Sequence, residues 1–298
     1  MEEKPYNKVD IDEYLKNLKK KLAENEIKKG SVLGDYTLEE KLSSNVFKAK
    51  NKANETVAVK VIKKTLFGSR SKRIRRFKRE AEILSRLNHP NIVKLRDFGE
   101  EDWVVYYAMD FIEGEDLFYL IEKHGQLSVP RTLRMAKKIA SALSSLHKKA
   151  IYHRDLKPSN IMVKYPDQEN EDAILIDFGI VKVADITDLT GTGTIVGTYG
   201  FIPPEQLDGQ PADARGDIYS LTTIVYQALS GRPVFIQEEG ESDGVFLART
   251  RDEKPPMLIE VRSISPELNA VVEKNLDKDP YQRCQNCEEY IAALEKFI

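Results

Sequence analysis

The hydrophobic pattern of the chain changes its period near the sequence EGED at residues 113–116. Before this point, short runs rich in β-branched and aromatic residues have the length and composition of strands. They are VFKA, TVAVKVI, IVKLRDF and WVVYYAMDFI, at residues 46–49, 56–62, 92–98 and 103–112. Residues 71–87 instead carry apolar side chains at helical spacing. The first part of the chain is therefore predicted to form a sheet with one packed helix.

After residues 113–116 the pattern becomes helical. One apolar helix face is formed by Leu133, Ala136, Ile139, Ala140, Leu143 and Leu146. Residues 218–231, IYSLTTIVYQALSG, are apolar nearly all round, which predicts a buried helix. Ser265 and Pro266 supply an N-cap and a first helical position, and residues 288–298 read as a last helix. We expect an α+β chain with a strand-rich lobe, a short hinge and a helical lobe.

Residues 1–34 differ from the rest of the chain. Within a segment dense in Lys, Glu, Asp and Asn, apolar residues recur at helical spacing, namely Ile11, Leu15, Leu18 and Leu22. Gly30 and Gly34 follow this narrow stripe, which predicts an amphipathic helical extension. Such a helix either docks on the main domain or contacts a partner or a second copy, and its short stripe does not decide between them.

The overall charge excludes some classes of partner. A formal net charge of -2 and a pI of about 6.2 give no global basis for binding nucleic acid or a membrane surface. No window approaches the roughly 18 uninterrupted apolar residues of a membrane span. The chain opens MEEKPYNK, unlike a signal peptide, and has only two cysteines. We therefore expect a reducing, cytoplasmic setting.

A lysine in the middle of a strand suggests the chemistry. Lys60 lies within TVAVKVI, where an unpaired ammonium would be costly to bury. Further along, Asp155, Asn160 and Asp177 lie in or beside apolar runs and offer the hard oxygen ligands and the base of a phosphoryl-transfer site. Lys60 would then face nucleotide phosphates, and Glu80 of the neighbouring helix is the best candidate to hold its ammonium in place. Taken alone, Lys60 would be better interpreted as an edge-strand lysine reaching into solvent, and only the matching positions of Glu80, Asp155 and Asp177 favour the phosphate-facing role.

Ordered motifs carry a family resemblance that extends from about Tyr36 to the C-terminus. They are VAVK (57–60), HPNIV (89–93), HRDLKPSN (153–160), DFG (177–179) and GTYGFIPPE (197–205). Together they resemble the eukaryotic-type (Hanks-type) Ser/Thr protein kinases, in the compact form common in bacteria. The resemblance implies a bilobal kinase fold at 35–298, with an antiparallel sheet and one helix at about 35–112, a hinge at about 110–116 and a mainly helical lobe at 117–298.

The resemblance also implies roles for individual residues. Asp155 would accept the proton of the substrate hydroxyl, Lys157 would contact the γ-phosphate, and Lys60 would pair with Glu80. Asn160 and Asp177 would bind magnesium, or manganese in its place. ATP would be the phosphate donor. Three further residues would be structural: Asp217 anchoring the catalytic-loop backbone, and Glu205 paired with Arg283.

A nucleotide-binding set follows from the same alignment. Asp110 and Ile112 would offer backbone groups to adenine, Met109 would line the back wall, and Asp116 would reach the ribose. The remaining members of the pocket would be Leu42, Val46, Ala58 and Met162.

The substrate is expected to be a protein serine or threonine. Lys157 and Thr198 resemble the Ser/Thr branch, whereas small-molecule phosphotransferases lack the PPE segment, the Arg283 partner and a threonine-rich loop. That loop offers candidate autophosphorylation sites, in the order Thr194, Thr192 and Thr190, and a phosphate on one of them would order the loop through Arg154.

One feature departs from the family pattern. Relatives have G-x-G-x-x-G between the positions of Leu42 and Val46, where this chain has only Ser43, Ser44 and Asn45. Glycines let backbone N–H groups approach the phosphates closely, so that this cover is either missing or rebuilt here. The departure keeps an alternative open, a pseudokinase or weakly active nucleotide-binding scaffold that works through partner binding.

Other features have simpler interpretations. His153 is expected to brace the region of Phe178 by packing and hydrogen bonding. Cys284 and Cys287 form an isolated CQNC that is expected to be buried, because a metal would need two more ligands. The basic run at residues 63–79 is expected to be a solvated helix face with its approach, with phosphate docking as the alternative.

Overall fold

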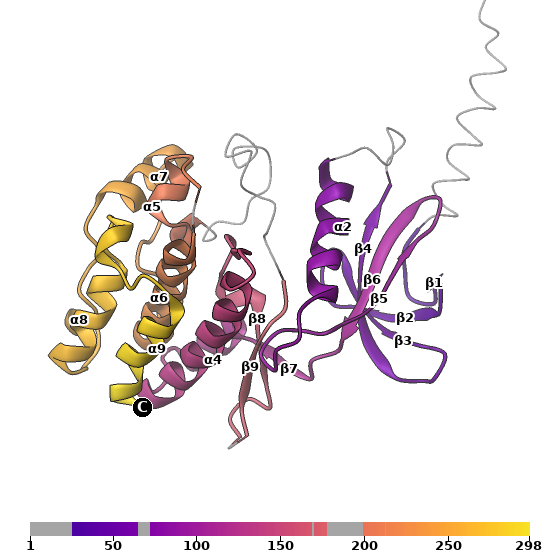
Figure 1. Cartoon of the computed structure of the whole chain (residues 1–298), viewed down its shortest axis with the longest axis horizontal. Coiled ribbons are helices and arrows are strands. Elements are labelled where there is room, and N and C mark those ends of the chain that lie inside the picture. Colours follow the sequence, from indigo (N-terminus) through magenta and orange to yellow (C-terminus); the bar gives the residue numbers. More distant parts are fainter. Residues whose placement is uncertain (1–25, 65–71, 169, 178–198, 212) are drawn as a thin grey trace, which may run out of the picture. The chain divides into compact units, whose positions relative to one another are not determined.

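The computed structural model describes residues 26–64, 72–168, 170–177, 199–211 and 213–298 (Figure 1). These residues form two compact units. Unit 1 comprises the described residues up to Ala81 together with Leu95–Phe111. Unit 2 comprises Glu82–Lys94 and the described residues from Ile112 onward. The predicted helix within residues 1–25 and the candidate phosphorylation sites in 178–198 lie outside the described residues.

Unit 1 contains a six-stranded antiparallel sheet in the order β1-β2-β3-β4-β6-β5. Its strands are β1 (Val32–Leu33), β2 (Tyr36–Lys41), β3 (Val46–Lys50), β4 (Thr56–Lys63), β5 (Leu95–Glu100) and β6 (Val104–Asp110). The helix α2 (Lys72–Ser85) begins in unit 1, and its residues 82–85 belong to unit 2. The sheet begins at Val32, three residues before the expected start of the domain at 35. Ile27 packs against the core of this sheet, so the fold recruits part of the segment before residue 35.

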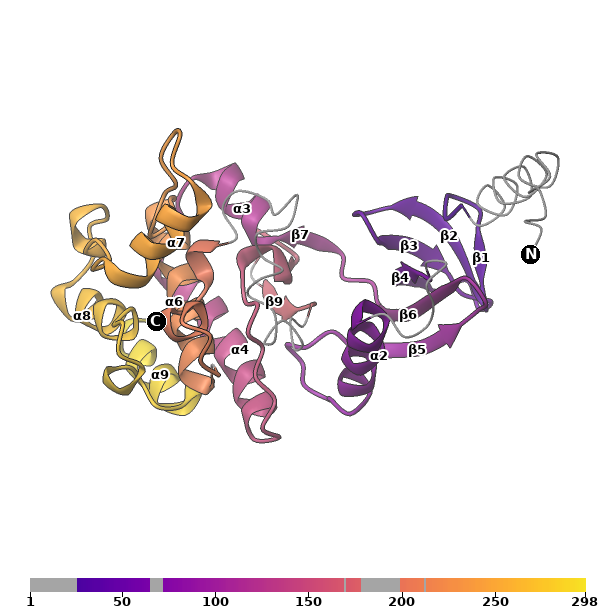
Figure 2. The ribbon, with the colours of Figure 1, turned by 90° about the horizontal axis from the view of Figure 1, so that it is seen from above.

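The alternation of side chains along β4 decides which residues face the helix. Val57, Val59 and Val61 join the buried cluster on one face of the sheet. Successive strand residues point to opposite faces, so Lys60 points to the other face. There α2 packs (Figure 2), and its residues Ile74, Phe77 and Ala81 are buried, as the helical spacing predicts.

The predicted strand at 92–98 is shifted in the structure. β5 starts at Leu95, and Ile92 and Val93 belong to unit 2. There the Val93 N–H donates to the Leu175 carbonyl at 2.9 Å, and Ile92 forms an isolated bridge with Leu175. Ile92 and Val93 would be buried both as the start of a strand and in their observed place beside Leu175. Their hydrophobicity therefore could not show which of these two positions they take.

Unit 2 is mainly helical, with one small three-stranded sheet in the order β7-β8-β9. Its strands and α-helices are β7 (Gly114–Asp116), α3 (Leu117–His124), α4 (Val129–His147), β8 (Ile161–Lys164), β9 (Asp172–Leu175), α5 (Pro204–Leu207), α6 (Ala214–Ser230), α7 (Asp243–Asp252), α8 (Pro266–Asn275) and α9 (Cys287–Leu294). Short 3-10 turns are η1 (Pro158–Asn160), η4 (Tyr199–Phe201), η5 (Leu258–Glu260), η6 (Pro280–Gln282) and η7 (Glu295–Phe297). The sheet with one helix and the helical remainder confirm the predicted fold class.

The apolar helix predicted at 218–231 is the centre of unit 2. It is α6, in which every residue from Gly216 to Ser230 is buried, and it contacts α4, α8 and α9.

The predicted cap of α8 is present, because the Ser265 hydroxyl accepts from the Leu268 N–H at 3.2 Å. Among the described helices, none is long and apolar enough to cross a membrane. Both cysteines are buried free thiols.

Candidate active site

Unit 1 places Lys60 and Glu80 together. The Lys60 ammonium lies 3.0 Å from Oε1 and 3.3 Å from Oε2 of Glu80, and the two side chains are only 11% and 9% exposed. β4 presents Lys60 to the helix, and Glu80 lies one turn after Phe77 on the buried side of α2. This geometry does not fit an edge-strand lysine reaching into solvent. The pair answers why a strand core tolerates an ammonium, since a buried charge is stable when it is paired.

The hairpin without glycines is a tight turn between β2 and β3. The N–H groups of Leu42 and Ser43 both donate to the Val46 carbonyl, at 2.9 and 3.1 Å. The Asn45 carbonyl accepts from the Val61 N–H at 2.8 Å. None of the residues 42–45 has a positive φ, so the turn does not need glycine. Two of its backbone donors are therefore committed within the hairpin and are not directed at a ligand.

The other nucleotide-binding candidates of unit 1 lie on adjacent strands. Ala58 and Met109 are direct cross-strand partners on β4 and β6, and both are buried. Val46 lies opposite Lys60, and Leu42 is 45% exposed. The Asp110 carboxylate forms an ion pair with Arg96.

Unit 2 holds Ile112, Asp116 and Met162 of the same candidate set. Asp116 and Met162 are paired residues of β7 and β8. The Asp116 carboxylate caps α3 by accepting from the Tyr119 N–H at 2.9 Å, so one of its oxygens is engaged. The carboxylate keeps acceptor capacity for the predicted contact with a ribose.

The catalytic-loop backbone is anchored by Asp217 of α6. The N–H groups of His153 and Arg154 donate to its two carboxylate oxygens at 2.8 and 2.9 Å. Arg154 has a φ of 61°. A non-glycine residue in this region costs about 1–3 kcal/mol and persists only where its surroundings hold it. The carboxylate of Asp217 supplies that support.

His147 is a member of this network that the sequence reasoning missed. Its Nε2 lies 2.8 Å from Asp217 Oδ2, at the C-terminal end of α4. Burial acts to raise the pKa of Asp217, but the contacts with His147, His153 and the Arg154 N–H together lower it. The sequence feature that could have identified His147 is its position near the end of an amphipathic helix, shortly before HRDLKPSN.

Asp155, Lys157 and Asn160 are grouped after this anchor. The Asn160 side-chain amide donates to the Asp155 carbonyl at 2.8 Å, and the Lys157 ammonium lies 3.9 Å from Asp155 Oδ2. The side chains of Lys157 and Asp155 are 24% and 17% exposed. The carboxylate is thus accessible, while its backbone is held by a buried amide.

The DFG aspartate is linked to the same loop. Nε2 of the fully buried His153 lies 2.5 Å from the Asp177 carbonyl. The Ile176 N–H donates to the Asn160 carbonyl at 3.0 Å. Burial lowers the pKa of His153, which suits a neutral ring that braces Asp177 better than an acid or base. The expected contact of His153 with the region of Phe178 lies outside the described residues.

The donor set fits magnesium. Asn160 uses its amide nitrogen on Asp155, which leaves its side-chain oxygen to act as a ligand. One carboxylate and one amide oxygen match a hard cation that keeps waters and binds substrate phosphates. Within the described ranges, no group of three or more His, Cys, Asp or Glu could hold a metal by itself.

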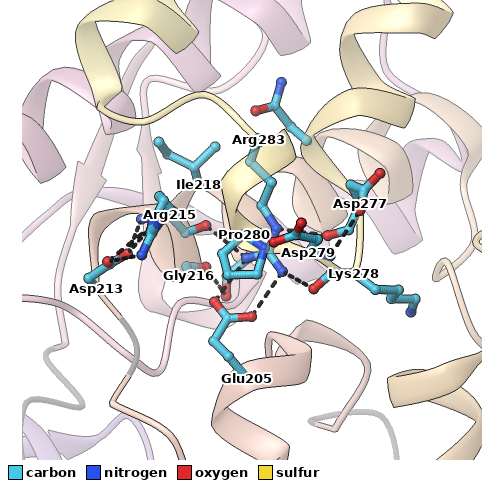
Figure 3. A network of polar contacts seen from close by, with 12 residues as sticks. Glu205, Asp213, Arg215, Gly216, Ile218, Asp277, Lys278, Asp279, Pro280 and Arg283 are labelled. Atoms are coloured by element: carbon cyan, nitrogen blue, oxygen red, sulfur yellow. Dashed lines mark hydrogen bonds and ion pairs between the residues drawn. The ribbon is translucent and has the colours of Figure 1, made fainter.

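A buried ion pair joins α5 to the C-terminal part of unit 2. Arg283 donates to both oxygens of Glu205 at 2.9 Å and is 1% exposed (Figure 3). It also donates to the carbonyls of Asp277, Lys278 and Arg215 at 2.8, 3.1 and 3.2 Å. Burial, and next the charge of Arg283, lower the pKa of Lys278 to about 8. The predicted pairing of Glu205 with Arg283 is present as a fully hydrogen-bonded contact.

Cys287 lies close to the catalytic-loop anchor, but both cysteines act as core residues. Cys287 begins α9, and its sulfur is 3.6 Å from His147 Nδ1. Burial raises the pKa of both thiols, which disfavours the reactive thiolate.

Comparison with known proteins gives a consistent result. Residues 41–293 match the protein kinase domain family. The chain is 36% identical over 259 residues to the serine/threonine-protein kinase pkn3 of Myxococcus xanthus, covering 84% of this chain and 47% of that protein. The probable serine/threonine-protein kinase CPE1738 of Clostridium perfringens is 36% identical over 256 residues, covering 85% and 36%. PknB of Mycobacterium leprae, also a serine/threonine-protein kinase, is 35% identical over 243 residues, covering 80% and 38%. The chain therefore spans less than half the length of each of these relatives.

Proposed function

Because the chain belongs to the protein kinase family, we propose that it transfers the γ-phosphate of ATP to serine and threonine hydroxyl groups of proteins. The observation that carries this proposal is the organised catalytic loop. Asp217 holds the N–H groups of His153 and Arg154, and Asn160 holds the carbonyl of Asp155. A fixed backbone presents the Asp155 carboxylate without further reorganisation, which is what general-base catalysis requires.

Each residue has a defined task in the proposed reaction. The substrate hydroxyl oxygen forms a bond to the γ-phosphorus, the bond from that phosphorus to the bridging oxygen breaks, and ADP leaves. Asp155 takes the hydroxyl proton, and Lys157 contacts the transferred phosphate. Lys60, oriented by Glu80, would contact the other phosphates. Asn160 and Asp177 would hold magnesium, or manganese, which neutralises phosphate charge when bound.

The activity is tested by incubating the protein with magnesium and ATP labelled at the γ-position. We expect time-dependent label on a generic protein substrate and on the chain itself, with Thr194, Thr192 and Thr190 as the first sites to examine by mass spectrometry. Addition of EDTA should stop the transfer, because the phosphates lose their counter-charge. Absence of label at all metal and ATP concentrations, with ATP binding intact, would favour the pseudokinase alternative.

The hairpin at residues 42–45 is the observation that favours the alternative. Two of its backbone N–H groups are committed to Val46, so fewer donors remain for phosphate oxygens. Each lost hydrogen bond to a charged oxygen is worth about 1.5–3 kcal/mol before water offsets part of it. We expect a net deficit of about 1–3 kcal/mol, roughly ten- to a hundredfold in ATP affinity or turnover.

This cost is measured by replacing Ser43–Asn45 with a full-length glycine-rich turn. We expect the graft to improve ATP affinity or turnover by the factor given above. A control that inserts the same number of residues as serines and alanines separates loop length from backbone freedom. If the parent already binds ATP at low micromolar concentration and the graft brings no gain, the side chains of the short turn compensate for the missing glycines.

We propose that residues 1–25 take no part in phosphate transfer and instead affect the stability, assembly or partner choice of the protein. Their apolar stripe suits docking on the main domain, on a partner or on a second copy of the chain. A chain beginning at residue 26 should keep peptide phosphorylation within a few fold, and its mass in solution compared with that of the full chain tests the self-association. The two free thiols are in keeping with a proposed reducing, cytoplasmic setting.

A further inference from the structure

The Lys60–Glu80 pair has a third member in unit 1, Tyr107 of β6. Lys60 and Tyr107 are direct cross-strand partners, so their side chains leave the sheet on the same face. The Tyr107 hydroxyl donates to Oε1 of Glu80 at 2.8 Å, and the residue is 0% exposed. The same carboxylate oxygen thus accepts from an ammonium on one strand and from a phenol on the next.

The Tyr107 ring is itself held by the helix that carries Glu80. Phe77 lies one turn before Glu80, and its ring centroid is 4.8 Å from that of Tyr107 with the planes tilted by 33°. The Lys60 ammonium lies 5.7 Å from the Tyr107 ring centroid. The phenol therefore has a fixed orientation between the sheet and α2.

Because Tyr107 also donates to Glu80, Lys60 can turn one of its donors away without leaving the Glu80 carboxylate unpartnered. An ammonium has three N–H donors, and Lys60 approaches both oxygens of Glu80 with them. When Lys60 turns a donor toward a phosphate, the Glu80 carboxylate loses one of the hydrogen bonds that offset the cost of burying it. A buried carboxylate is costly unless its oxygens stay hydrogen-bonded. The Tyr107 hydroxyl meets that need, because it remains on Oε1 whichever way the ammonium turns.

We propose that Tyr107 is a positioning residue that holds Glu80, and with it α2, against the sheet independently of Lys60. Its effect on phosphate transfer rests on the proposed kinase function, whereas its effect on α2 does not. The hydroxyl of Tyr107 acts on the reaction only through Glu80.

The first test compares Tyr107→Phe with the matched control Tyr106→Phe. Both variants remove one hydroxyl from a buried tyrosine of β6, but Tyr106 faces the opposite side of the sheet, where its ring meets Tyr36 edge-on at 6.2 Å. We expect Tyr107→Phe to speed hydrogen exchange of the α2 amides at residues 76–81 about tenfold, as expected for losing one charge-assisted hydrogen bond. It should lower kcat by a similar factor with the KM of the protein substrate unchanged. Tyr106→Phe should change neither quantity.

The second test uses a background in which Lys60 is absent. In Lys60→Met, α2 should keep most of its exchange protection, and adding Tyr107→Phe should remove it. In Glu80→Ala, adding Tyr107→Phe should have no further effect on α2, because the acceptor is gone. Exchange is measured without ATP, so it does not depend on activity. If the parent proved inactive, the proposed kinase function would be wrong, but the exchange data would still test whether Tyr107 holds Glu80.

The outcomes that overturn the proposal are specific. Unchanged α2 exchange on Tyr107→Phe in both the parent and Lys60→Met would show that the hydroxyl does not hold Glu80. Equal effects of Tyr106→Phe and Tyr107→Phe on α2 would show that both act through general stability of the sheet.

Discussion

Replacing Asp155 with asparagine should lower the rate of phosphate transfer about 100- to 10,000-fold, the usual contribution of a positioned general base. The amide has nearly the shape of the carboxylate but cannot take the hydroxyl proton. The fold should survive, because the bonds of the Asp155 backbone to Asn160 and His153 do not involve the replaced group. The rate is measured at saturating magnesium and ATP with a generic protein substrate.

Asp102→Asn is the matched control for that measurement. It removes one carboxylate from an exposed position between β5 and β6 and should leave the rate within about twofold, as is usual for a surface change. Unfolding curves for both variants should overlay that of the parent. Turnover of Asp155→Asn within a few fold of the parent would contradict the proposed role, and with it the assignment of the catalytic loop.

Replacing Arg283 with methionine should destabilise the protein by about 3–5 kcal/mol, the cost of leaving a buried charge without its partner. Glu205 would keep a carboxylate that is 8% exposed and has lost two hydrogen bonds. The carbonyls that Arg283 also satisfies would lose their donors as well. The free energy of unfolding in urea measures the effect.

Two further variants make this second prediction specific. Arg215→Met removes a guanidinium from the same network, but its partner Asp213 is 39% exposed, so the loss should be about 1 kcal/mol or less. The double variant Glu205→Leu with Arg283→Met should recover part of the loss, because no charge remains buried. A loss from Arg283→Met no larger than that from Arg215→Met would show that the buried pair contributes little to stability.

Local pattern was sufficient to predict several parts of this molecule. The valines that alternate with Ala58 and Lys60 predicted a strand, and the spacing of Ile74, Phe77 and Ala81 predicted the helix beside it. Glu80 follows from that spacing, since a helix that buries Phe77 brings Glu80 to the same side one turn later. Such inferences succeed because they depend only on the backbone periods of strands and helices.

Contacts between distant segments could not be predicted in this way. Ile92 and Val93 read as the start of a strand, and their pairing with Leu175 in unit 2 depends on residues far along the chain. The Tyr107–Glu80 bond requires the register of β4 against β6, which alternating hydrophobicity leaves open.

By itself, the sequence determined the identity and order of the chemical groups, because the motifs around Lys60, Asp155 and Asp177 are contiguous and each side chain follows from its position in a local element. Only the tertiary structure decided which partners satisfy those groups: Tyr107 on Glu80, His147 on Asp217, and backbone carbonyls on Arg283. The physical reason is that burial makes every polar group require a partner, whereas packing alone selects which of many suitable partners comes within hydrogen-bonding distance.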